Sequence, residues 1–164
     1  MVVFFLSECP EVECYYMGKD KFENEDLIKY ALPHDIWFHV DEHSSAHVYL
    51  RMRDPKFDSY EKLPEQAIKE CAILTKANSI QGCKLGSVNV IYTWARNLSK
   101  KDCVEVGSVN YHDRKQVIKV LDVKKDNNII RQLMKTKKES FPRLDVLKEE
   151  HMSKMAATAK AERK

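Results

Sequence analysis

The chain lacks the cysteine patterns of disulfide-stapled and zinc-binding proteins. Its 164 residues include five cysteines, an odd number, and no C-x-x-C pair. This pattern argues against a disulfide framework and against a cysteine-based zinc site. We therefore expect a reducing compartment, either the cytoplasm or the nucleus.

Long apolar runs are also missing. The longest run extends from Val2 to Leu6, and no positively charged segment precedes it. The sequence therefore predicts neither a signal peptide nor a transmembrane segment. It leaves open whether a longer form of the protein associates with a membrane.

Alternation of residue types marks the segment from Asp35 to Arg51 as a β-hairpin. Side chains alternate between the two faces of a strand, and every second residue here is apolar. The apolar face consists of Ile36, Phe38, Val40, Ala46, Val48 and Leu50. With residues 41–45 as the turn, the other face pairs Asp35 with Arg51, Trp37 with Tyr49, and His39 with His47.

Similar patterns around the hairpin predict the rest of the fold. Strands are expected at 2–6, 12–17, 87–93, 104–109 and 116–123, and helices at 22–31 and 63–78. From Asp126 onward a further helix is expected, with a basic face made by Arg131, Lys135, Lys137 and Lys138. The predicted fold class is α+β, with helices packed on a mostly antiparallel, mixed sheet.

The chain divides by composition into a globular domain over residues 1–141 and a charged helical extension over residues 142–164. The extension has no stop signal at its end, so we expect it to begin a longer helix or coiled coil. The residues of the extension that could form a weak coiled-coil seam are Leu144, Leu147, His151 and Met155.

The net charge of +3 hides an asymmetry along the chain. Residues 1–95 carry 10 Lys or Arg against 15 Asp or Glu, whereas residues 96–164 carry 18 against 10. A basic C-terminal part suits an anionic partner such as RNA, DNA or the ribosome. Charge alone nevertheless favours an ordinary solvated helix face.

Three separated motifs carry a resemblance to a known family. They are G-K-D-K-F-E-N-E-D-L-I at 18–28, the hairpin, and K-A-N-S-I-Q-G-C-K at 76–84, which is followed by V-N-V-I-Y-T. Together they resemble the NFACT-R domain family over about residues 1–141. The resemblance implies a nucleic-acid partner, either RNA or DNA, with the ribosome or tRNA among the candidates.

The predicted binding surface is the polar face of the hairpin. Exposed Trp37 and Tyr49 would stack on bases, while His39, His47 and Arg51 would hold phosphates or base edges. Lys19, Lys21 and Lys84 are further candidates, because each lies near a glycine in a matched motif, where a phosphate can approach the backbone. In the competing interpretation, a helix covers this face and the aromatic rings on it belong to the core.

Two alternatives belong to other functional classes. In the first, the chain is a protein-interaction module that binds a coiled-coil partner through its C-terminal helix. In the second, His39 and His47 form a metal or acid–base site of an enzyme. No H-E-x-x-H, G-x-S-x-G, Walker loop or paired-carboxylate motif supports that enzyme. We therefore predict a protein without catalytic residues, metal ligands or a cofactor.

Overall fold

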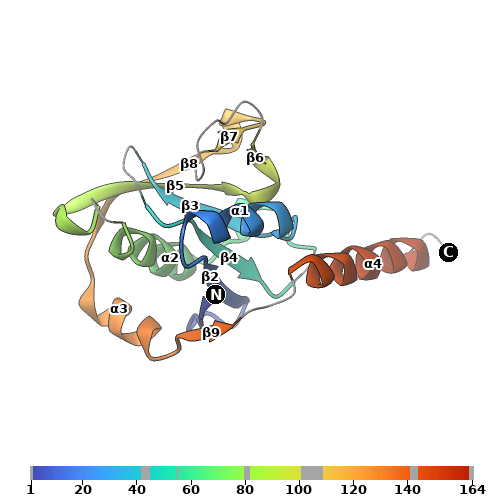
Figure 1. Ribbon diagram of the computed structural model, residues 1–164, viewed down its shortest axis with the longest axis horizontal. Helices are drawn as coiled ribbons and strands as arrows, with labels where there is room; N and C mark the ends of the chain where they lie inside the picture. Colours follow the sequence, from blue (N-terminus) through green and yellow to red (C-terminus); the bar gives the residue numbers. More distant parts are fainter. Residues whose placement is uncertain are drawn as a thin grey trace.

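A seven-stranded antiparallel sheet forms the centre of the protein (Figure 1). The computed structural model describes residues 2–41, 45–54, 56–79, 82–100, 109–140 and 144–162. The strands of the sheet, in chain order, are β1 (Val2–Phe5), β2 (Val12–Met17), β3 (Ile36–Val40), β4 (Val48–Met52), β5 (Ser87–Trp94), β8 (Ile118–Lys124) and β9 (Lys138–Ser140). They lie in the order β8-β5-β3-β4-β2-β1-β9, and β6 (Leu98–Ser99) pairs with β7 (Asn110–Tyr111) in a separate two-stranded ribbon.

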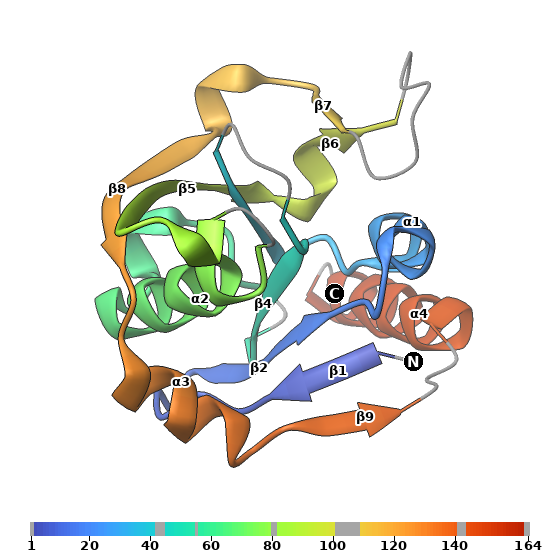
Figure 2. The same cartoon turned by 60° about the vertical axis from the view of Figure 1, so that its left-hand side comes forward.

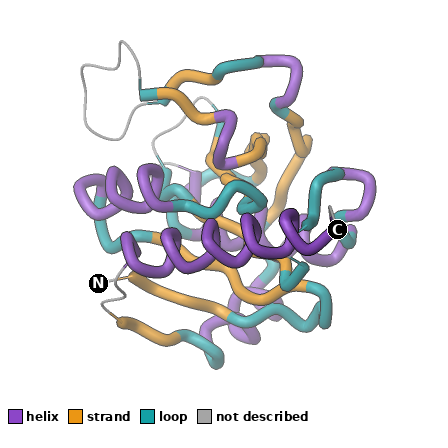
Figure 3. Tube along the Cα trace, turned by 90° about the vertical axis from the view of Figure 1, so that its right-hand side faces the viewer, coloured by secondary structure: helices purple, strands orange, loops and turns teal. Residues whose placement is uncertain are grey.

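Helices cover both faces of the sheet, as Figure 2 shows. They are α1 (Lys21–Tyr30), α2 (Glu65–Ala77), α3 (Asn127–Met134) and α4 (Leu144–Glu162). Helix α2 packs on β3, β4, β5 and β8 and contacts α3, whereas α1 lies on the opposite face, beside α4. Figure 3 shows α4 crossing that face towards the C-terminus. The α+β class and the C-terminal helix predicted from the sequence are confirmed.

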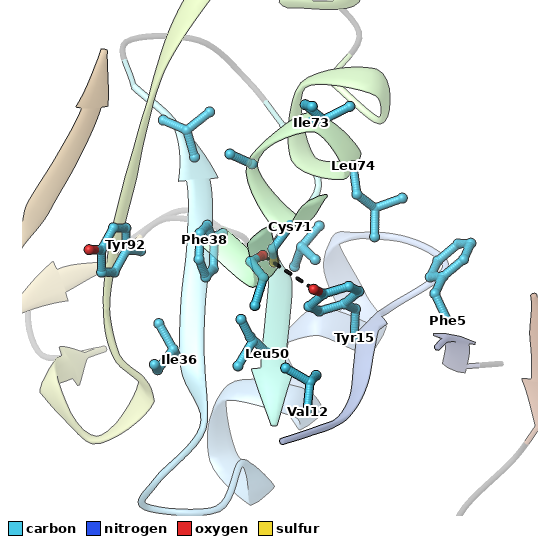
Figure 4. Close-up of a cluster of buried hydrophobic side chains, with 14 of the residues drawn as sticks. Phe5, Val12, Tyr15, Ile36, Phe38, Leu50, Cys71, Ile73, Leu74 and Tyr92 are labelled. Carbon is cyan, nitrogen blue, oxygen red and sulfur yellow. Dashed lines mark hydrogen bonds between the residues drawn. The ribbon is translucent and has the colours of Figure 1, made fainter. Parts of the chain in front are cut away.

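The main core lies between the sheet and α2. Figure 4 shows the hairpin's apolar residues Ile36, Phe38 and Leu50 pointing towards the helix that carries Cys71 and Leu74. All five side chains are almost completely buried. Fully burying one such side chain contributes about 1.5–3 kcal/mol. The apolar face identified by the alternation thus packs against α2 in the main core.

The expected strands and helices occur with shifted ends. Residues 101–108 lie outside the described part of the chain, so nearly all of the strand expected at 104–109 is untested. The basic helix was predicted too long: α3 ends at Met134, and Lys138 lies in β9, paired with Phe4 of β1. The Thr136 hydroxyl explains this end, because it donates to the Leu133 carbonyl at 2.7 Å and accepts the Leu6 N–H at 2.9 Å.

One buried carboxylate crosses the core from α2 to the first two strands. Glu70 is buried, and its Oε1 accepts hydrogen bonds from the Ser7 hydroxyl at 2.6 Å and the Tyr15 hydroxyl at 2.8 Å. Burial raises the pKa of Tyr15, which keeps its hydroxyl protonated as a donor. These bonds attach the β1–β2 turn to α2.

In the described ranges, none of the helices has the length and apolar character needed to span a membrane.

The Glu70 interaction generates a stability prediction. Tyr15→Phe removes one donor from a buried carboxylate, and we expect it to lower the free energy of unfolding by about 1–3 kcal/mol. Tyr92→Phe is the matched control, because the Tyr92 hydroxyl has no hydrogen-bond partner among the described residues. Urea denaturation measures both, and equal small losses in the two variants would contradict the role assigned to Glu70.

Candidate nucleic-acid interface

The strand pairing predicted for the hairpin is confirmed. Its polar face, however, is largely buried, whereas we expected it to be exposed. Trp37 pairs with Tyr49 across β3 and β4, and Asp35 forms an ion pair with Arg51. Trp37 is 1% exposed and Tyr49 is 0% exposed. The expectation that these two rings lie open to bases is therefore wrong.

Helix α1 covers Tyr49, and Tyr111 of the β6–β7 ribbon packs against Trp37 with ring centroids 5.9 Å apart. A second apolar cluster fills the space between this helix and the sheet, and it consists of Val2, Cys14, Tyr16, Leu27, Ala31, Trp37, Tyr49, Ala95 and Leu98. Tyr16 stacks on Tyr49 with ring centroids 4.8 Å apart. The Tyr49 hydroxyl donates to Asn24 Oδ1 of α1 at 2.8 Å. The covering helix thus satisfies the hydroxyl of Tyr49, and a buried aromatic hydroxyl usually has such a partner.

Arg51 is held by a buried carboxylate. Its Nε and Nη2 each donate to Asp35 at 2.9 Å, and Asp35 is 0% exposed. The same carboxylate accepts from the Leu32 N–H and the Tyr16 hydroxyl. Burial and the negative charge of Asp35 raise the pKa of Tyr16, so its hydroxyl remains a donor. Arg51 therefore serves first as the counter-ion of Asp35.

His39 and His47 lie together on the polar face. Neither imidazole carries the positive charge that would attract a phosphate. The Trp37 indole N–H donates to Nδ1 of His47 at 2.7 Å, and this acceptor nitrogen requires an uncharged imidazole. The rings of His39 and His47 are 4.9 Å apart in an edge-on contact, and burial lowers the pKa of His39. Within the described ranges, no group of three or more His, Cys, Asp or Glu side chains is arranged to hold a metal ion.

The predicted lysines remain at the surface, in two places. Lys19 and Lys21 are exposed on either side of Asp20, whose side chain accepts the Glu23 N–H and caps α1. Lys84 is exposed in the short 3-10 helix Gly82–Lys84, which contacts α2 on the other face of the sheet. The structure therefore brings Lys19 and Lys21 together and leaves Lys84 apart from them.

Phe22 was missed by the sequence reasoning. Its ring is 64% exposed, and it is the only aromatic residue among the large exposed hydrophobics of the described chain. The Nζ of Lys21 lies 5.5 Å from the ring centroid. Asn24 and Leu27 are the buried residues of α1, and Phe22 does not share their face, so its exposure follows from the helical period only once that face is known.

A groove of about 680 Å³ opens where Arg51 reaches the surface. One wall comes from α4, whose Leu147, His151 and Met155 line it, and the His151 ring stacks on His34 at 5.2 Å. Three of the four residues proposed as a coiled-coil seam thus face the globular part of the chain. Glu13 and Glu150 line the groove together with Arg51, Arg53 and Lys154, so it carries charges of both signs.

The structure is similar to that of the C-terminal part of the fibronectin/fibrinogen-binding protein from Streptococcus suis, with a TM-score of 0.64, 19% identity, and coverage of 82% of this chain and 48% of that one. A likeness at this level of identity concerns the fold alone.

Sequence comparison then gives the family. The family model described as "NFACT protein RNA binding domain" matches residues 1–113. Coiled-coil domain-containing protein 25 of Bos taurus is 52% identical over 151 residues, which cover 91% of this chain and 72% of that protein. Protein JLP2 of Saccharomyces cerevisiae is 38% identical over 146 residues, which cover 86% and 70%. The chain belongs to the NFACT-R family, and the resemblance found in its motifs is confirmed.

Burial of the hairpin rings generates a second stability prediction. We expect Trp37→Ala to lower the free energy of unfolding by about 3–5 kcal/mol, because it leaves a cavity in the second apolar cluster and removes the donor to His47. Phe22→Ala is the control, and its effect should stay within about 0.5 kcal/mol because the ring is exposed. Chemical denaturation with far-UV circular dichroism measures both, and an unchanged transition in Trp37→Ala would show that the ring is not part of the core.

Burial of His39 also generates a pH prediction. The unfolded chain takes up a proton on this imidazole as the pH falls through its ordinary pKa of 6.5, while the folded chain resists protonation. Below that pH the unfolded state binds more protons, so we expect the unfolding free energy to decrease as the pH falls. His39→Gln should make this decrease shallower in denaturation series between pH 7 and 5. A variant with the full wild-type slope would contradict the assignment to His39.

Proposed function

We propose that this chain is a non-catalytic nucleic-acid-binding domain, that RNA is its ligand, and that it works in the cytoplasm or nucleus. Membership of a family described as an RNA-binding domain supports the ligand class. The observation that carries the proposal is the surface at the start of α1, where the exposed Phe22 ring lies 5.5 Å from the Lys21 Nζ and Lys19 is exposed three residues earlier. We refer to these three residues as the Phe22 surface.

The chemistry of the Phe22 surface suits a single strand. Every base has a π-face, so an exposed ring stacks on bases with little sequence preference, and each contact is worth about 1–3 kcal/mol. The ammonium groups of Lys19 and Lys21 would contact the phosphates of the bound strand. Asp20 and Glu23 lie beside them, but both carboxylates hydrogen-bond backbone N–H groups at the start of α1. We expect stacking to contribute more than charge at this surface.

An unpaired RNA segment within a larger RNA, such as a tRNA or ribosomal RNA loop, presents such bases. Competition among single-stranded RNA, single-stranded DNA and duplex DNA, followed by fluorescence anisotropy at two salt concentrations, tests the ligand class. The proposal expects single-stranded RNA to compete best and duplex DNA to compete least. Preference for the duplex would overturn it.

Substitution of Phe22 tests the surface itself. We expect Phe22→Ala to weaken binding of single-stranded RNA by about 5- to 150-fold, the equivalent of one lost stacking contact. Phe22→Tyr keeps the ring and should retain the affinity. Leu121→Ala is a control for the loss of an exposed apolar side chain, because Leu121 is exposed on the edge strand β8.

Equal affinities of the Phe22→Ala and Phe22→Tyr variants would contradict a stacking role. Replacement of Lys19 and Lys21 by glutamine adds a second readout. Each phosphate contact that is lost should reduce the slope of log affinity against log salt concentration by about 0.7 for a single strand. An unchanged slope would remove both lysines from the interface.

A further inference from the structure

The motif K-A-N-S-I-Q-G-C-K contributes to a cavity on the face of the sheet opposite the Phe22 surface. The cavity has a volume of about 280 Å³ and lies between α2, the 3-10 helix Gly82–Lys84 and the start of α3. Its polar lining consists of Lys76, Cys83, Lys125 and Asn127, and Ile73 and Ile130 are among its apolar walls. A space below the usual range of about 300–1,000 Å³ for drug-sized ligands suits a small molecule or ion.

Lys76 is the unusual member of this lining. Its side chain is 2% exposed, and its Nζ donates one hydrogen bond, to the Leu85 carbonyl at 2.8 Å. An ammonium group has three donors. Across the described ranges, no carboxylate lies within ion-pair distance of it. A buried charge without a counter-ion is expensive, so an anion bound beside Lys76 would stabilise it.

The turn after α2 is built to hold Lys76 in this position. Gly82 packs so closely that a Cβ there would lie 2.8 Å from the Ser79 hydroxyl oxygen, which accepts the Gly82 N–H at the same distance. The Leu85 N–H then donates to the Gly82 carbonyl at 3.2 Å. This geometry turns the chain back so that the Leu85 carbonyl meets the ammonium group.

The lining side chains of the cavity that are charged at neutral pH are all basic. Lys76 and Lys125 line it, and none of its lining residues is a carboxylate. The nearest acidic residue along the chain, Asp126, lines the neighbouring groove instead, and its side chain caps α3 by accepting the Asn128 and Ile129 N–H groups. An anion in the cavity would therefore have Lys76, Lys125 and Asn127 among its neighbours and no carboxylate.

We propose that this cavity binds a phosphate-type anion, either inorganic phosphate or a phosphate monoester, between Lys76 and Lys125. Phosphate offers several acceptor oxygens, which match the unused donors of Lys76 and the exposed ammonium of Lys125. The site is separate from the Phe22 surface and does not depend on it.

Isothermal titration with inorganic phosphate and with uridine 5′-monophosphate tests the site, and uridine serves as the uncharged control. We expect both anions to bind and uridine not to bind; whichever anion binds more tightly identifies the source of the phosphate. Lys125→Gln should weaken binding by about tenfold, the effect of one hydrogen bond to a charged group. Lys124→Gln is the matched control, because Lys124 lines only the neighbouring groove, whereas Lys125 lines both that groove and the cavity. Equal losses of phosphate affinity in the two variants would show that the lysines act only by nonspecific attraction, and this would overturn the proposal.

Cys83 supplies a local readout in the intact chain. It is exposed and lines the cavity, whereas Cys9, Cys14 and Cys71 are buried, and burial raises the pKa of Cys14 to about 12. Phosphate should slow the alkylation of Cys83 by iodoacetamide, as followed by peptide mass spectrometry. An unchanged rate under saturating phosphate would place the anion elsewhere and overturn the proposal.

Two further variants complete the test. A folded Lys76→Met protein that still binds phosphate with wild-type affinity would overturn the assignment; if that variant does not fold, the Lys125 and Lys124 pair decides. Phe22→Ala should leave phosphate binding unchanged. Loss of RNA binding with intact phosphate binding would therefore separate the two sites.

Discussion

The buried ion pair between Asp35 and Arg51 is the interaction on which the arrangement of the sheet and α1 depends. Asp35 stands at the start of β3, Arg51 near the end of β4, and Tyr16 of β2 donates to the same carboxylate. The Leu32 N–H, just after α1, is a further donor. Removing one partner of such a pair costs about 3–5 kcal/mol, because the other charge stays buried. One carboxylate thus joins three strands to the segment that follows the covering helix.

The polar face of the hairpin was expected to be exposed to solvent, and this network is part of the reason that it is largely buried instead. Alternation along a strand separates two faces and even predicts the pairs Asp35–Arg51 and Trp37–Tyr49, which the structure confirms. It does not say what lies on either face. Helix α1 has a narrow buried face, formed by Asn24 and Leu27, and Asn24 supplies the acceptor for Tyr49. A polar residue inside a helix gave no sign in the sequence that it would meet a buried tyrosine.

The surface features were harder to predict than the core for a physical reason. Core positions repeat with the period of their strand or helix, whereas an exposed ring such as Phe22 is recognised only once the buried face of its helix is known. Lys76 is the opposite case: lysines are almost never fully buried unless paired, so its burial could not be expected from its type. The candidate seam of α4 likewise became interpretable only when His151 was found against His34.

The central claim is that the polar face of the hairpin stabilises the fold, whereas nucleic acid binds at the exposed start of α1. A double-mutant cycle of Asp35→Asn and Arg51→Gln, with RNA affinity measured for every variant that folds, tests it most directly. The account predicts a coupling energy of about 0.5–3 kcal/mol in the unfolding free energy and wild-type affinity for RNA in the folded variants. Additive effects on stability together with loss of RNA binding in Arg51→Gln would contradict it.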